Sequence, residues 1–289
     1  MNIAFIGLGM MGRPMAECLI AKGFSVRVYD IDPASSAEFG NASAPSPAEA
    51  AAEADIIVTM LPNGEIVRQA LLGENGALAS AAPNSIVIDT SSSDAGGTVA
   101  LGAELAAHGI TLIDSPVSGG VPMAREGTLA LMVGGAEDDT LYARVQPVLE
   151  AMGKRIVRVG GLGAGHAAKA INNAIAAATL AATAEGLVLG EKFGLKPDIL
   201  LDVFNNSTGR SAVSESVFRT QILPRTYAQG FAMALMTKDV GLAENLRAQL
   251  GLNLPMLQAT CAQWREALAD SAPGTDFTAY HLFTEKRAG

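Results

Sequence analysis

Apolar and polar residues follow two different patterns along this 289-residue chain. In the first half, short runs rich in Ile, Val and Leu alternate with longer stretches that have helical periodicity. The runs predicted to be strands are NIAFIGLG, SVRVYD, DIIVTML, SIVIDTS, ITLIDSPVSG, LALMVGG and RIVRVGG. Continuous apolar runs indicate strands that are buried on both faces, and their alternation with helices indicates a doubly wound, mostly parallel α/β sheet.

The second half contains only helical periodicity. One long helix is predicted from Gly163 to Phe193, because Gly194 and Pro197 follow it as stop signals. Turn signals at GLKPD, NNSTGRS and GLNLP divide the remaining residues into further helices. We therefore expect a sheet domain over residues 1–162, a connecting helix over 163–193 and an all-helical domain over 194–289.

Composition narrows the class of protein. Apolar residues make up 49% of the chain, which excludes general disorder, and the formal net charge of −9 lacks the positive footprint of a nucleic-acid binder. No run approaches the roughly 18 uninterrupted apolar residues of a membrane helix. The apolar start MNIAFIGLGMMG has no basic residue and is interrupted by glycines, unlike a signal peptide. We expect a soluble, cytoplasmic protein without nucleic-acid or membrane partners.

The cysteines and histidines give no sign of a metal site. Cys18 and Cys261 are far apart, and neither lies in a C-x-x-C or C-x-x-H pattern, so we expect free thiols and no disulfide. The three histidines share no common spacing. Of these, His166 precedes Lys169 by three residues, and a role for it in a cleft is the less favoured alternative.

A glycine motif follows the first predicted strand and opens the first helix. In Gly7-x-Gly9-x-x-Gly12 the first glycine allows a tight turn, the second lets a pyrophosphate approach the backbone, and the third lets the helix pack on the strand. Asp30 closes the next strand, where a carboxylate accepts hydrogen bonds from ribose hydroxyls and repels a 2′-phosphate. The pattern predicts an NAD site, with NADP as a possibility. Its predicted loop residues are Gly7, Leu8, Gly9, Met10, Met11 and Gly12.

Two further strand ends are candidates for the same ligand. Parallel sheets bind ligands at the carboxyl ends of their strands. Met60, Leu61 and Pro62 follow the third strand and are predicted to flank the cofactor, although an ordinary Pro-Asn-Gly turn is the alternative. Thr90 ends the next strand and is a candidate for contact with the nicotinamide ribose, but hydroxyls at strand ends are common.

The segment DSPVSGG ends another strand with a stiff, open turn. Ser118, Gly119 and Gly120 offer a hydroxyl and unhindered backbone amides, which suit a small carboxylate. A glycine-rich turn without a ligand is an equal alternative from these residues alone.

The alanine-rich helix GAGHAAKAINNAIAAATLAATAEG contains one lysine and two asparagines. Lys169 and Asn173 are four residues apart and share a helix face, and Asn172 lies beside them. A lysine that faces a cleft loses solvent, which favours its neutral form and suits it to proton transfer. An exposed, solvated lysine is the alternative. Farther along, Lys238 and Asp239 have a surface ion pair as their default interpretation.

Together these motifs resemble the β-hydroxyacid dehydrogenase family, which includes 3-hydroxyisobutyrate dehydrogenases and tartronate semialdehyde reductases. FIGLGMMGRPMA is similar to the family's cofactor signature, and DSPVSGGVPMAREGTLALMVGG is similar to its substrate segment. GAGHAAKAINN is similar to its catalytic G-x-G-x-x-x-K-x-x-N-[NQ] element, and FAMALMTKDVGLA to its later K-D-x-x-L-A element. The four segments occur in the family's order and span nearly the whole chain.

The resemblance implies a Rossmann domain, a long helix and a helical domain, and it implies roles for particular residues. Lys169 would be the acid/base, Asn173 and the Ser118–Gly120 loop would bind substrate, and Lys238 would reach the cofactor. The expected reaction is reversible hydride transfer between NAD and a short 3-hydroxy acid of the 3-hydroxyisobutyrate type. Tartronate semialdehyde and threonate-like substrates remain alternatives, as does a non-catalytic Rossmann binding module. Dimers or tetramers formed through the helical domain are also implied.

Overall fold

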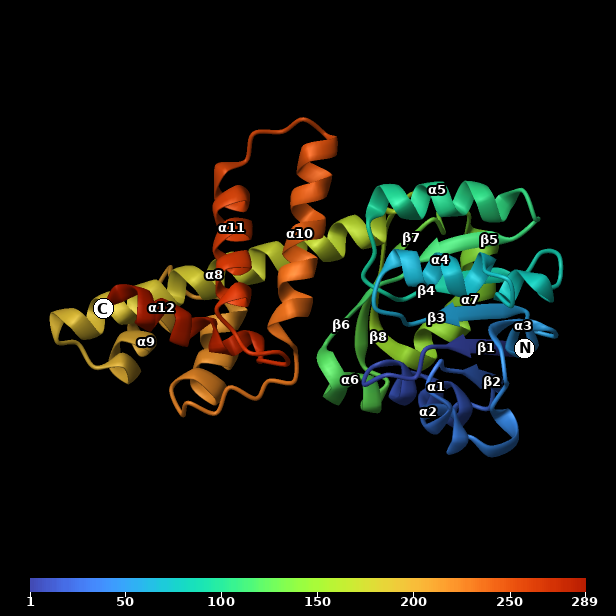
Figure 1. Ribbon diagram of the computed structural model, residues 1–289, viewed down its shortest axis with the longest axis horizontal. Coiled ribbons are helices and arrows are strands. Elements are labelled where there is room, and N and C mark those ends of the chain that lie inside the picture. The colour runs from blue at the N-terminus through green and yellow to red at the C-terminus, as the bar shows by residue number, and fades with distance from the viewer. The chain divides into compact units, whose positions relative to one another are not determined.

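The computed structural model describes residues 1–289, which divide into two compact units (Figure 1). Unit 1 comprises Met1–Lys169 and unit 2 comprises Ala170–Gly289. Unit 1 contains the strands and most of the cofactor-type motifs. Unit 2 is helical, in agreement with the prediction from its periodicity.

The elements of unit 1 alternate in the predicted way. Its strands are β1 (Asn2–Ile6), β2 (Ser25–Tyr29), β3 (Ile56–Thr59), β4 (Ile86–Asp89), β5 (Thr111–Asp114), β6 (Val117–Ser118), β7 (Leu129–Gly134) and β8 (Gly153–Gly160). Its α-helices are α1 (Gly12–Ala21), α2 (Pro33–Ala37), α3 (Pro47–Ala51), α4 (Gly64–Leu72), α5 (Ala95–Ala106), α6 (Gly120–Glu126) and α7 (Asp139–Met152). Short 3-10 turns lie at η1 (Gly40–Ala42) and η2 (Ala77–Ala79).

The remaining elements are helices. They are α8 (Ala164–Phe193), α9 (Pro197–Asn205), the π-helix η3 (Val213–Ile222), α10 (Met233–Gln249), α11 (Pro255–Ala269), the 3-10 turn η4 (Phe277–Ala279) and α12 (Tyr280–Ala288). Unit 1 ends at Lys169, so the first six residues of α8 belong to it and the rest of the helix belongs to unit 2.

The sheet has the order β2-β1-β3-β4-β5-β7-β6, with β8 paired to β7. Strands β1 to β5 run parallel, which confirms the predicted doubly wound, mostly parallel sheet. One predicted strand, ITLIDSPVSG, is divided by Ser115-Pro116 into β5 and β6, where proline lacks the N–H that a strand needs. After this break β7 runs antiparallel to both β5 and β6.

Alternate strand residues enter two different cores, which explains why the runs are apolar throughout. One face of the sheet packs against α1 and α7, through residues that include Phe5, Val58, Ile88, Met15 and Leu149. The other face packs against α4 and α5, through residues that include Ile6, Ile57, Val87, Val67 and Leu105. The helices on both faces leave the carboxyl ends of the parallel strands as the edge available for a ligand.

The alanines of α8 let neighbouring helices approach closely in unit 2. Ala177 and Ala184 are fully buried there, and the indole N–H of Trp264 donates to the Ala177 carbonyl at 3.3 Å. Trp264 stacks on Tyr280 with 4.6 Å between ring centroids. By length and mean hydropathy (1.3) α8 is apolar enough to cross a membrane, and half of its apolar window is buried inside the protein.

A buried histidine gives unit 2 a pH-dependent stability. His281 is 5% exposed and packs edge-on against Phe218, and burial lowers its pKa from the usual 6.5. Because the unfolded chain then binds the proton more readily, this contribution is present above about pH 6.5 and is lost as the pH falls below it. The Glu285 carboxyl, whose pKa is lowered by its hydrogen bond to Arg225, titrates at more acidic pH.

We therefore expect the free energy of unfolding to fall between pH 7.5 and 5.5, and His281→Gln to flatten this dependence. Urea unfolding at both pH values measures the effect. His108→Gln is the matched control, because it replaces an exposed histidine of unit 1. An unchanged slope in His281→Gln would show that His281 is not the group responsible.

Candidate active site

The glycine loop between β1 and α1 is packed so closely that two of its glycines leave no room for a side chain. Gly7 has φ +101°, and a Cβ there would lie 2.3 Å from the Met60 carbonyl oxygen. A Cβ at Gly12 would lie 1.9 Å from the Gly7 carbonyl oxygen. A Cβ at Gly9 meets no atom within 4 Å, so this glycine faces open space. Gly7 and Gly12 thus allow close packing within the protein, whereas the backbone at Gly9 faces open space.

Asp30 lies beside this loop, as its place at the end of β2 predicts. Its Oδ2 accepts the Leu8 backbone N–H at 2.6 Å, and its Oδ1 accepts the Asp32 N–H at 2.8 Å. Asp32 itself caps α2 by accepting the Ala34 N–H. The Asp30 carboxylate therefore anchors the glycine loop and retains lone pairs that can accept further hydrogen bonds.

A pocket of about 580 Å³ opens next to the loop. Its lining residues are Leu8, Gly9, Met10, Arg13, Pro14, Glu17, Ser35, Val121 and Arg125. The Arg13 guanidinium donates to the Glu38 carboxylate and to the Ser35 carbonyl, and this pairing lowers the pKa of the exposed Glu38 carboxyl. An open Gly9 side, helix-start amides and the nearby Asp30 carboxylate fit a dinucleotide's pyrophosphate and ribose.

The loop after β3 lies against the glycine loop. The Met60 N–H donates to the Ile6 carbonyl, and the Leu61 N–H donates to Ser91 Oγ at 2.9 Å. Met60 and Leu61 are half-buried and Pro62 is exposed. The structure thus brings this loop to the predicted cofactor edge of the sheet.

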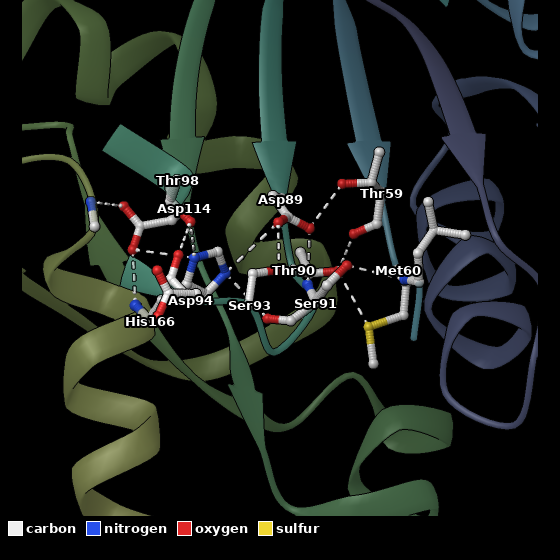
Figure 2. Close-up of polar contacts among 12 residues, drawn as sticks. Thr59, Met60, Asp89, Thr90, Ser91, Ser93, Asp94, Thr98, Asp114 and His166 are labelled. Carbon is white, nitrogen blue, oxygen red and sulfur yellow. Dashed lines mark hydrogen bonds and ion pairs between the residues drawn. The ribbon is translucent and has the colours of Figure 1, made fainter. Parts of the chain in front are cut away.

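Thr90 lies at the end of β4, and its hydroxyl has a partner within the sheet. It is 1% exposed, and its hydroxyl donates to the Thr59 carbonyl at 2.6 Å (Figure 2). The hydroxyl therefore joins the ends of β3 and β4, and contact with a nicotinamide ribose remains a prediction of the sequence.

The buried carboxylate of Asp89 organises the neighbouring strand ends. Its Oδ1 accepts the Thr59 hydroxyl at 2.8 Å and the Ser91 N–H at 3.0 Å, and its Oδ2 accepts the Ser93 hydroxyl at 3.2 Å. Asp89 is 2% exposed, so these hydrogen bonds replace the water that a buried carboxylate has lost. Figure 2 shows the resulting row of polar side chains across the strand ends.

The predicted substrate loop requires its glycines. Gly119 has φ +134° and Gly120 has φ +68°, conformations that other residues rarely adopt. Ser118 is half-buried at the end of β6, where it pairs with Ala130 of β7, and both glycines are exposed. This turn leads directly into the short helix α6.

Lys169 is half-buried in the second turn of α8. That helix begins at the carboxyl end of β5, because the Gly163 N–H donates to the Asp114 carboxylate at 2.8 Å. His166 is buried in the turn that precedes Lys169, with Nε2 3.1 Å from the Ser91 carbonyl oxygen. Lys169 therefore belongs to the same edge of the sheet as the glycine loop and Thr90.

Within unit 2, Asp239 joins two predicted residues. Its Oδ2 accepts the Asn173 amide N–H at 2.7 Å, and its Oδ1 lies 3.2 Å from Lys238 Nζ. Asn173 and Asp239 are 7% and 3% exposed, whereas Asn172 is exposed and donates to Asn173 Oδ1. The Lys238–Asp239 pair is thus a partly buried connection to Asn173, and not the surface ion pair that the dipeptide alone suggests.

The sequence indicated no functional role for Asp89 and Asp114, and for Asp239 it indicated only an ion pair with Lys238. Asn173, which donates to Asp239, lies 66 residues away along the chain. Asp89 and Asp114 end strands β4 and β5 in the same way that Asp30 follows β2. An acid at the end of a strand was the available signal. The contacts that join these acids to other elements were not visible, because Thr59 lies 30 residues from Asp89 and His166 lies 52 residues from Asp114 along the chain.

Two family models match the chain. The NAD binding domain of 6-phosphogluconate dehydrogenase matches residues 2–161. The second model, described as NAD-binding of NADP-dependent 3-hydroxyisobutyrate dehydrogenase, matches residues 163–282.

Two named relatives are similar to this chain over most of their length. The 2-(hydroxymethyl)glutarate dehydrogenase of Eubacterium barkeri is 39% identical over 258 residues, which cover 88% of this chain and 85% of that protein. A probable 3-hydroxyisobutyrate dehydrogenase of Mycobacterium tuberculosis is 40% identical over 287 residues, 96% of each chain. The solved structure of the M. tuberculosis 3-hydroxyisobutyrate dehydrogenase with L-serine is 38% identical, covers 98% of both chains and has a TM-score of 0.89.

The two glycines at either end of the GMMG turn offer a matched test of the loop. Gly12→Ala places a Cβ against the Gly7 carbonyl, so we expect a loss of about 1–3 kcal/mol or more in the free energy of unfolding. Gly9→Ala meets no protein atom, so we expect wild-type stability and roughly tenfold weaker NAD binding, about 1.4 kcal/mol. Urea unfolding and calorimetric titration with NAD measure the two effects. Equal effects of both variants on stability would contradict the separate roles.

Proposed function

This chain belongs to the β-hydroxyacid dehydrogenase family, and on that premise we propose its substrate class and its catalytic residues. It is an NAD(P)-dependent oxidoreductase that acts on hydroxy acids. The proposed reaction is reversible hydride transfer between NAD and a short 3-hydroxy acid, with Lys169 as the acid/base. The attachment of the lysine-bearing turn of α8 to the cofactor edge of the sheet carries this proposal.

The chemistry of three compounds supports the substrate class. Two relatives are named for 3-hydroxyisobutyrate and 2-(hydroxymethyl)glutarate, and the similar solved structure contains L-serine. All three compounds have a hydroxymethyl group on the carbon that bears a carboxylate. We propose that this shared unit is what the chain recognises, with 3-hydroxyisobutyrate-like acids as the first candidates. Tartronate semialdehyde and threonate-like acids are the alternatives.

The proton transfer falls to Lys169 in this proposal. A bound nicotinamide supplies or accepts the hydride, and the protein supplies binding, orientation and charge. In oxidation the neutral amine of Lys169 takes the hydroxyl proton. In reduction the protonated amine hydrogen-bonds to the aldehyde oxygen and donates its proton.

The other proposed contacts bind and orient the substrate. The Ser118 hydroxyl and the exposed amides of Gly119 and Gly120 offer donors to the substrate carboxylate. Asn173 lies four residues beyond Lys169 on α8, and the Asp239 carboxylate fixes its amide through Nδ2. Fixed donors of this kind favour the near-attack geometry that hydride transfer needs. The contact of Lys238 with the cofactor remains an inference from the family resemblance.

We propose NAD as the preferred cofactor. Asp30 places a negative charge at the ribose end of the loop, where it would repel a 2′-phosphate. Arg13, one of the two arginines that line the pocket, donates to the Ser35 carbonyl and is neutralised by Glu38. Both features disfavour NADP, although the second family model is named for an NADP-dependent enzyme.

The location and assembly of the enzyme are also proposals. Cys18 and Cys261 are free thiols, as expected in a reducing cytoplasm, whereas some relatives are described as mitochondrial. An apolar groove of about 420 Å³ on unit 2 supports self-association. Its lining residues are Ile171, Ala174, Ile175, Ala178, Ala243, Leu246, Arg247, Leu250, Leu252, Leu254, Met256, Leu257 and Thr260.

Lys169→Ala tests the proposed mechanism. We expect kcat to fall by about 10²–10⁴-fold, because the proton acceptor is lost, while NAD affinity stays near that of the wild type. Absorbance at 340 nm with NAD or NADP and a panel of 3-hydroxy acids measures turnover, and calorimetry measures NAD binding. Lys192→Ala, on the same helix, is the control for charge loss. Near-wild-type turnover in Lys169→Ala would exclude this mechanism, and no turnover or NAD binding in the wild type would favour a non-catalytic module.

Self-association is tested by placing a charge in the apolar groove. Ile175 is 61% exposed in the single chain, so Ile175→Glu should leave the fold intact and disfavour a dimer or tetramer. We expect light scattering to give a dimeric or tetrameric mass for the wild type and a smaller mass for the variant. A monomeric wild type would refute the proposal.

A further inference from the structure

The helix that carries Lys169 has no capping side chain in its own sequence. It begins at Ala164, and the preceding residue is Gly163, which has no side-chain oxygen to accept the first N–H groups. Asp114 of β5 supplies the missing acceptor instead. Its Oδ1 accepts the Gly163 N–H at 2.8 Å, and its Oδ2 accepts the His166 N–H at 2.7 Å. The cap of α8 is therefore fixed to the sheet.

Glycines make room for this cap. A Cβ at Gly134 would lie 2.5 Å from Asp114 Oδ1, and a Cβ at Gly165 would lie 2.8 Å from Asp114 Oδ2. A Cβ at Gly165 would also lie 2.2 Å from the Met132 carbonyl oxygen. The second glycine of the G-x-G pattern before Lys169 is thus required by the approach of the Asp114 carboxylate to the helix start.

The imidazole of His166 forms a second attachment in the same turn. Its Nδ1 lies 2.7 Å from Thr98 Oγ1 of α5, and its Nε2 lies 3.1 Å from the Ser91 carbonyl oxygen (Figure 2). Since a carbonyl only accepts, Nε2 carries a proton. Two carboxylates face the ring, with Asp89 Oδ2 at 3.6 Å from Nε2 and Asp114 Oδ2 at 3.8 Å from Nδ1. The imidazole ring of His166 is fully buried, so its two nitrogens form hydrogen bonds to protein groups in place of water.

We propose that Asp114 and His166 form a clamp that positions Lys169 for proton transfer. The clamp fixes the rotation and the height of the first helical turn, and Lys169 follows His166 by three residues on the adjoining part of the helix face. Both residues act through Lys169 and are positioning residues. The inference rests on the proposed acid/base role of Lys169, which the Lys169→Ala variant tests separately.

Three variants of the clamp and one control test this proposal. His166→Leu removes both ring contacts, His166→Gln retains an amide donor and acceptor, and Asp114→Asn replaces one N–H acceptor with a donor. Asp138→Asn is the control, because Asp138 caps a different helix, α7, where it accepts the Leu141 N–H at 2.8 Å. Calorimetry with NAD, urea unfolding, and kcat measured from pH 6 to 10 with the active 3-hydroxy acid complete the set.

We expect kcat to fall by about 10²-fold in His166→Leu and Asp114→Asn, since a misplacement of about 1 Å has this effect on reacting groups. His166→Gln should recover part of the loss, and the affinity for NAD should stay within about twofold of the wild type. The midpoint of the pH profile of kcat should shift in the clamp variants and stay unchanged in Asp138→Asn. A purely structural role would lower kcat and NAD-binding capacity together, with the folded fraction, and would leave the midpoint in place.

The outcomes separate the clamp from the catalytic role of Lys169. If Lys169→Ala is inactive but folded His166→Leu has wild-type kcat and pH profile, the clamp is refuted and the proposed function stands. If Lys169→Ala is as active as the wild type, the proposed mechanism itself fails. If Asp114→Asn does not fold, the comparison of His166→Leu with His166→Gln decides, because equal kcat values in these two variants would also refute the clamp.

Discussion

The register of the parallel strands is the constraint on which the rest of unit 1 depends. Thr59 of β3 pairs with Ile6 and with Asp89, and Asp89 pairs with Asp114, so the last residues of four strands stand in one row. Everything that follows these residues in the sequence must leave the sheet along the same edge. The glycine loop, the loop after β3 and Thr90 lie together for this reason. The start of α8 follows β8 instead, and the Asp114 carboxylate attaches it to the same edge.

Carboxylates at the strand ends make this shared edge rigid. The buried Asp89 and Asp114 and the half-buried Asp30 each accept backbone N–H groups from a different connection. A buried carboxylate without such partners would be strongly destabilising, so Asp89 and Asp114 require these connections to stay in place. The sheet thereby sets the position of the segments that we propose to bind cofactor and substrate.

Much of this arrangement could be predicted from sequence, because local patterns determined it. The strand runs gave the sheet, and the glycine spacing with Asp30 gave a loop that the structure shows to be hydrogen-bonded to that acid. The antiparallel β7 and the short helices α2 and α6 were missed, since each depends on packing or on a few residues without periodicity. The attachment of α8 was also out of reach. Its cap comes from Asp114, so the local sequence around Gly163 contains no acceptor that could reveal it.

The pair between Arg13 and Glu38 has a consequence for how cofactor preference changes during evolution. Replacing Asp30 removes a negative charge but also removes the acceptor of the Leu8 N–H. An enzyme that changes first at Asp30 therefore loses a hydrogen bond that holds its glycine loop. Glu38 is 71% exposed and accepts only from the guanidinium that it neutralises. Loss of this one surface acid frees a cation at the mouth of the pocket without disturbing the backbone. A change of preference toward a cofactor with a phosphorylated ribose therefore disturbs the loop less when it begins at Glu38 than when it begins at Asp30.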